Sequence, residues 1–132
     1  MVTSSSRPRP LSPNIQRYRP QLTSVLSILN RLTGLLLSIA AIGLVLLLFA
    51  AADGPRSYTV VHAAFVSDVG RVILFGCTFT FFLHFLGGIR HLVWDTVHGF
   101  ELRTIYLSGW TVVIASAVLT VIAWTASLYV GG

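Results

Sequence analysis

The sequence predicts an all-α membrane protein with three transmembrane helices, and three observations support this fold class. The hydrophobic fraction is 55% and the charged fraction is only 10%, whereas a soluble domain usually carries about 25% charged residues. Three apolar segments each reach the roughly 20 residues that a helix needs to cross a bilayer core. None of them shows the strict alternation of a membrane β-strand, so helices are favoured over a barrel.

We divide the 132 residues into a basic leader, residues 1–22, and a membrane domain, residues 23–132. Prolines recur through the leader and rule out a continuous helix there. We therefore expect the leader to be disordered, or to lie extended on a partner protein or on lipid headgroups. The membrane domain should contain helices at about residues 23–52, 69–94 and 105–130, with a turn and a short amphipathic piece after the first.

A cleaved signal peptide is the alternative interpretation of the first apolar segment, because arginines precede it. However, the apolar run is longer than the roughly 7–15 residues of a signal-peptide core, and the leading segment is unusually long. We therefore favour a retained transmembrane helix.

The placement of arginine predicts the orientation across the membrane. The formal net charge is +5, and arginines are concentrated in the N-terminal segment and at the edges of the second loop, where Arg90 and Arg103 lie. The C-terminal tail, residues 130–132, has no charged side chain. The N-terminus and the second loop should therefore face the cytoplasm, or the matrix of a mitochondrion, and the C-terminus should face the opposite side.

The second apolar segment carries polar and small residues on one helix face. They follow one another at steps of four, three and four residues: His84, Gly88, His91 and Asp95. An ionisable residue inside a membrane segment is a functional hypothesis by default, and neutral imidazole is a natural ligand of haem iron. The alternative for His84 is a histidine that forms a hydrogen bond across a helix interface.

His84 and His91 cannot both ligate one haem iron. Seven residues separate them by roughly 10 Å along a helix, and both project from the same face. Two axial ligands must approach the iron from opposite sides, only about 4 Å apart. If the haem has two histidine ligands, the second one should come from another chain.

The first apolar segment begins with a similar face, formed by Ser27, Arg31, Gly34 and Ser38. An arginine one turn from a serine, at the edge of a membrane helix, can donate hydrogen bonds to anionic or carbonyl oxygens. Haem propionates and quinone carbonyls are both candidates. The alternative is an arginine that sets orientation, beside serines that pack a helix pair.

The remaining features have simpler interpretations. Arg90 could reach the membrane surface or form a charge pair at the helix end. In the third apolar segment, Ser116, Thr120 and Ser127 suggest packing and anchoring. The single cysteine, Cys77, excludes a disulfide framework and a cysteine metal cluster. We find no phosphate-binding glycine loop and no nucleic-acid module, and we expect no nucleic-acid partner.

Two spaced motifs resemble those of the cytochrome b membrane-anchor subunits of succinate dehydrogenase, respiratory complex II. The first, "HFLGGIRHLVWD" (His84 to Asp95), fits that family at every position. The second begins "RPL" (Arg9 to Leu11) and continues as "SILNRLT" (Ser27 to Thr33). It fits except at Asn30, where the family usually has histidine. Asparagine can donate a hydrogen bond but cannot carry a proton charge, so it does not suit a proton-relay role at this position.

The resemblance implies a non-catalytic anchor subunit in the tricarboxylic acid cycle and in respiratory electron transport, within a two-subunit haem-binding bundle. His84 would be one axial ligand of haem b, and a second anchor subunit would supply the other. Ser27 and Arg31 would line the ubiquinone pocket, Arg31 and His91 would lie near the haem, and Asp95 would lie near the proton path. Further partners would be an iron–sulfur subunit and a flavoprotein, in a bacterial or mitochondrial inner membrane.

Three other functions remain open from the sequence. The nearest is an anchor of fumarate reductase that works with menaquinone in the reverse direction. A haem-free transporter subunit would use the polar faces as a proton or substrate path. A structural membrane scaffold would use them only for packing.

Overall fold

The computed structural model describes residues 21–99 and 101–130, which form helices joined by short turns. Three helices are long: α1 (Leu22–Asp53), α3 (Asp68–Asp95) and α4 (Leu102–Val130). A short helix, α2 (Pro55–Val66), joins α1 to α3. The three long helices are long and apolar enough to cross a membrane, which confirms the predicted fold class. The division between leader and membrane domain stays a prediction, because residues 1–20 lie outside the described residues.

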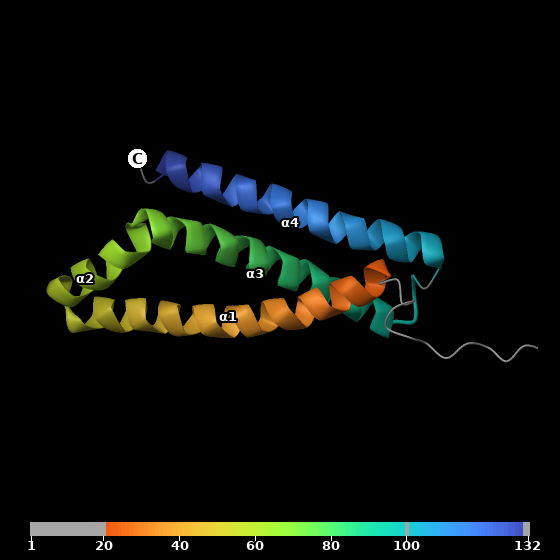
Figure 1. Ribbon diagram of the computed structural model, residues 1–132, viewed down its shortest axis with the longest axis horizontal. Coiled ribbons are helices and arrows are strands. Elements are labelled where there is room, and N and C mark those ends of the chain that lie inside the picture. Colours follow the sequence, from red (N-terminus) through yellow and green to blue (C-terminus); the bar gives the residue numbers. More distant parts are fainter. Residues whose placement is uncertain (1–20, 100, 131–132) are drawn as a thin grey trace, which may run out of the picture.

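The long helices lie side by side, with α3 between α1 and α4 (Figure 1). The start of α1, the end of α3 and the start of α4 meet at one end of the molecule, which we call the Asp95 end. The short helix α2 and the last turns of α4 lie at the other end. The motif residues of α1 and the second half of the α3 motif are therefore gathered near the Asp95 end.

Glycine, proline and serine set the turns around α2. Gly54 ends α1 with a φ of 135°, a left-handed value that favours glycine, and Pro55 follows at a position where a backbone N–H would have no helical partner. Ser67 caps α3, since its Oγ accepts a hydrogen bond from the Gly70 amide at 3.1 Å. A Cβ on Gly70 would overlap the carbonyl oxygen of Ala64, so this turn requires glycine.

The buried face of α4 consists of small and polar residues. It contains Gly109, Val112, Ser116 and Thr120. The hydroxyls of Ser116 and Thr120 donate to main-chain carbonyls one turn earlier, at 2.6 and 2.7 Å, so the interface buries no unsatisfied hydroxyl there. Small residues let membrane helices approach closely. Ser116 and Thr120 thus pack as predicted, whereas the Ser127 side chain is exposed in this chain and its packing role stays a prediction.

Candidate functional site

His84 is tied to α1 across the interface between α1 and α3. Its Nδ1 lies 3.0 Å from the main-chain oxygen of Asn30 and 3.2 Å from Oγ1 of Thr33. The Thr33 hydroxyl donates to the same Asn30 oxygen at 2.9 Å. The three groups form a small network that fixes the position and the tilt of the imidazole ring.

The network also determines which ring nitrogen of His84 carries the proton. A carbonyl oxygen can only accept a hydrogen bond, so the contact with Asn30 requires the proton on Nδ1. In a neutral imidazole the Nε2 lone pair then remains for another bond. Nε2 has no hydrogen-bond partner within residues 21–99 and 101–130. Metal-ligating histidines typically have this arrangement, with the second nitrogen held by a carbonyl.

Glycines adjoin the His84 ring and the helix face that it shares. A Cβ on Gly34 of α1 would lie 3.1 Å from Cε1 of His84 and 3.9 Å from its Nε2, so a larger residue would press on the ring. One turn after His84 on the same face, a Cβ on Gly88 would have no atom of the described chain within 4 Å. The space next to this face can therefore admit a bulky group from outside the chain.

Asn30 of α1 and Gly87 of α3 lie in close contact near the site. A Cβ on Gly87 would lie only 2.8 Å from Oδ1 of Asn30. This Oδ1 is buried and accepts no hydrogen bond from the described part of the chain. It lies at a small pocket of about 20 Å³ between α1, α3 and α4, which has room for about one water molecule.

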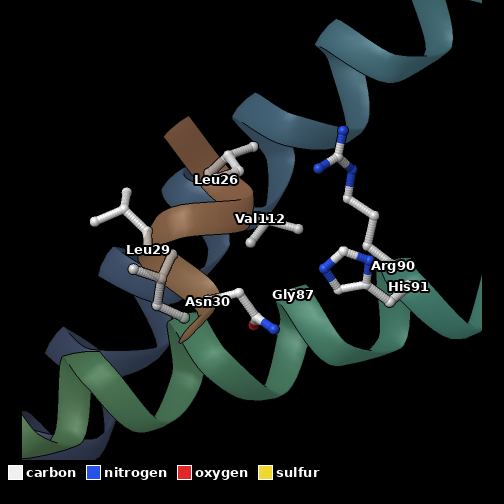
Figure 2. A pocket seen from close by; sticks show the side chains of 8 residues that line it. Leu26, Leu29, Asn30, Gly87, Arg90, His91 and Val112 are labelled. Atoms are coloured by element: carbon white, nitrogen blue, oxygen red, sulfur yellow. The ribbon is translucent and has the colours of Figure 1, made fainter. Parts of the chain in front are cut away.

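His91 enters the same small pocket from α3. In Figure 2 its ring points toward the side where Asn30 and Gly87 lie, and Leu26 and Val112 line the same pocket. The ring also meets Trp94 edge to face, with centroids 5.5 Å apart. His91 is thus a half-buried neighbour of Asn30 rather than a member of the hydrogen-bond network that holds His84.

Arg90 points away from His91 and joins α3 to α4 (Figure 2). Its Nε donates to Oγ of Ser108 and its Nη2 donates to the main-chain oxygen of Ile105, both at 3.0 Å. Its guanidinium carbon lies 4.1 Å from the ring centroid of Trp94, and the side chain is only 8% exposed. The sequence predicted that Arg90 reaches the membrane surface or forms a charge pair at the helix end. In the structure it does neither and forms a buried connection between helices.

The other predicted site residues lie apart from this network. Ser27 is half-buried, while Arg31 and Asp95 are exposed. None of the three forms a side-chain hydrogen bond or ion pair within the described residues. Ser27 and Arg31 are one turn apart on α1, so their side chains are neighbours on the helix surface. Their polar groups are available to a ligand or to a partner chain.

The described residues do not complete a metal site by themselves. Among residues 21–99 and 101–130, no three His, Cys, Asp or Glu side chains lie close enough to hold one ion. His62 stacks on Tyr58 within α2, and Nδ1 of His98 lies 2.6 Å from the main-chain oxygen of Thr96.

Sequence reasoning missed two groups at this site, the Thr33 hydroxyl and the Asn30 carbonyl. Thr33 enters the sequence analysis only as the last residue of a motif, and no residue type marks a main-chain carbonyl. Helical spacing could have predicted one of these contacts. Thr33 follows Asn30 by three residues, so its hydroxyl can donate a hydrogen bond to the Asn30 carbonyl.

Comparison with known proteins places the chain among membrane subunits of respiratory enzymes. The family described as "Succinate dehydrogenase/Fumarate reductase transmembrane subunit" matches residues 5–123. The succinate dehydrogenase cytochrome b556 subunit of Rickettsia conorii is 35% identical over 116 residues, covering 88% of this chain and 90% of the relative. The corresponding subunit of Paracoccus denitrificans is 33% identical over 114 residues, covering 86% and 88%. A cytochrome b560 subunit from Reclinomonas americana is 33% identical over 122 residues, covering 88% and 84%.

Proposed function

The chain belongs to the succinate dehydrogenase/fumarate reductase transmembrane subunit family, and on this premise we propose that it binds haem b through His84 and forms part of a ubiquinone-reduction site. As a member of this family it is an integral membrane subunit that anchors the enzyme. The reaction at succinate would take place on other subunits, and this chain would have no catalytic site of its own.

The observation that carries the haem proposal is the contact between His84 Nδ1 and the Asn30 main-chain oxygen at 3.0 Å. It leaves the Nε2 lone pair for iron and holds the ring at one angle. The small residues around the ring agree with a flat ligand, since Gly34 lies against the imidazole and Gly88 leaves the adjoining helix face open. When bound, haem b would supply a one-electron redox centre within the membrane.

The second axial ligand would come from a second anchor subunit. His91 does not suit this role, because it is on the same helix as His84, seven residues or roughly 10 Å further on. A haem held between two anchor chains would also explain why the His84 face of α3 has small residues.

Ser27 and Arg31 support the quinone proposal. Both are on the first turns of α1 and neither uses its side chain within the described residues. The Ser27 hydroxyl and the Arg31 guanidinium can donate hydrogen bonds to quinone carbonyls and stabilise the negative charge that develops on reduction. Electrons would arrive from a flavoprotein through an iron–sulfur subunit docked at the Asp95 end.

Protons for quinone reduction would be supplied at the same end. Asp95 is exposed and can exchange protons with the aqueous phase. His91 lines the small pocket next to Asn30, where the family motif usually has a second histidine. Because Asn30 cannot titrate, we assign it a hydrogen-bonding role and leave the proton path to Asp95.

The proposed function is tested on the assembled complex by comparing His84→Ala with His62→Ala, which changes a histidine on α2 at the opposite end. We expect His84→Ala to lower the haem content and the low-spin b-type absorption, while His62→Ala keeps both. Undiminished haem in the assembled His84→Ala complex would overturn the ligand assignment. Two assays on the same preparation distinguish a succinate dehydrogenase from a fumarate reductase. One measures succinate oxidation with ubiquinone, and the other measures fumarate reduction with menaquinol.

A further inference from the structure

A second and larger groove lies between α3 and α4 near the Asp95 end. Its volume is about 360 Å³, within the roughly 300–1,000 Å³ typical of ligand pockets. Apolar side chains form most of its wall, among them Leu86 and Val93 from α3 and Val112 and Ala115 from α4. The groove therefore suits a ligand with an elongated apolar part.

A buried positive charge lies in this groove. Arg90 lines it, is only 8% exposed, and forms its two hydrogen bonds with neutral acceptors, Ser108 and Ile105. These bonds use two of the five N–H groups of the guanidinium, and Nη1 donates to no acceptor within the described residues. The Trp94 ring, whose centroid lies 4.1 Å from the guanidinium carbon, offsets part of the cost of burying this charge. No carboxylate pairs with Arg90 within the described residues, so an anionic group at Nη1 would stabilise this arrangement further.

The groove is separate from the proposed haem site. At roughly 100° per residue, Arg90 and Val93 are on the side of α3 roughly opposite to His84 and Asp95. The groove borders exposed apolar side chains, including Ile89 at 43% and Val93 at 48%. A ligand could thus enter from the surrounding lipid without crossing the His84 face.

We propose that the groove binds an anionic phospholipid, with an acyl chain against Leu86, Val112 and Ala115 and the phosphate toward Arg90. Thr104 lines the groove where α4 begins. Arg103, next in sequence, is exposed and adds to the attraction that anionic lipids have for basic residues at the membrane surface. Glu101 is exposed nearby but does not line the groove.

A pair of alanine substitutions on α4 tests the apolar half of the site. Ala115→Phe fills the groove, whereas Ala117→Phe adds the same volume at an exposed position outside it. The purified, delipidated complex is titrated with phosphatidylglycerol or phosphatidylcholine, and bound lipid is counted by native mass spectrometry. We expect Ala115→Phe to bind phosphatidylglycerol roughly tenfold more weakly than Ala117→Phe, because even two fewer buried methylene groups change affinity by about that factor.

Arg90→Gln tests the charged half. The wild type should prefer phosphatidylglycerol over phosphatidylcholine, and Arg90→Gln should lose that preference.

Equal phosphatidylglycerol binding by the two phenylalanine variants would overturn the proposal, and so would equal binding of both lipids by the wild type. Cross-linking of Ala115→Cys to a helix of another subunit would overturn it as well, by showing a protein in the groove. The haem spectrum of each variant should be unchanged, so failure here is distinct from failure of the His84 assignment.

Discussion

The Nδ1 atom of His84 on α3 lies 3.0 Å from the main-chain oxygen of Asn30 on α1. This contact links two helices and sets the imidazole tautomer at the same time. It depends on the backbone of residue 30, so it persists although asparagine replaces the histidine usual in the family motif. The substitution therefore leaves the proposed iron ligand intact and changes only the side chain that faces Gly87.

Thr33→Val should weaken haem binding without preventing assembly. The change keeps the side-chain shape but removes the hydroxyl that lies 3.2 Å from Nδ1 of His84 and donates to Asn30. We expect haem to dissociate roughly tenfold faster, at the low end of what the loss of a partner of a metal-ligating histidine causes. Transfer of haem to an excess of an apo-haem protein measures this rate. Thr33→Ser keeps the hydroxyl and should behave as the wild type; a rate equal to that of Thr33→Val would contradict the prediction.

Gly87→Ala should destabilise the contact between α1 and α3. The added Cβ would lie 2.8 Å from Oδ1 of Asn30, and such overpacking costs about 1–3 kcal/mol. The gain in helix propensity offsets up to about 1 kcal/mol of that. Thermal unfolding of the complex should show the loss, whereas Gly76→Ala, where a Cβ meets nothing within 4 Å, should not.

Coupling between positions 30 and 87 tests the cause of that loss. In the background of Asn30→Ala the clash is absent, so Gly87→Ala should become neutral or stabilising. Strictly additive effects of the two substitutions would show that the contact does not cause the instability.

Arg31→Ala should raise the KM for ubiquinone with little effect on stability. Arg31 is exposed and forms no side-chain bond within the described residues, so its removal breaks no packing. The loss of a charged hydrogen bond of about 1.5–3 kcal/mol corresponds to a roughly tenfold or larger change in affinity.

Succinate oxidation with a soluble artificial acceptor should be unchanged in Arg31→Ala, because that reaction does not use the quinone site. Arg71→Ala, at the other end of the molecule, is the matched control. An unchanged KM in Arg31→Ala would remove Arg31 from the quinone site.

The long helices could be predicted because the length and apolarity of a segment are local properties. The His84 face could also be predicted, since helical spacing alone defines it. The third apolar segment has hydroxyl side chains but no ionisable group, which predicted packing, and Ser116 and Thr120 are buried. Ser127 is exposed in this chain, so its role in packing or anchoring stays a prediction.

Contacts between helices could not be predicted from spacing. The partners of His84 and Arg90 depend on how the helices are placed against each other, and both include main-chain oxygens that no sequence pattern marks. Arg90 is the clearest example. Its position near the end of α3 suggested a surface role, but the packing of α4 buries it beside Ser108.

The central claim is that Nε2 of His84 ligates haem iron, and chemical rescue of His84→Gly tests it most directly. The assembled variant is purified, and its reduced-minus-oxidised visible spectrum and oxidised EPR spectrum are recorded with and without added imidazole. The account predicts loss of the low-spin six-coordinate signals in His84→Gly and their return with imidazole, which can occupy the space left by the side chain. A low-spin bis-imidazole spectrum in His84→Gly without imidazole would contradict the account.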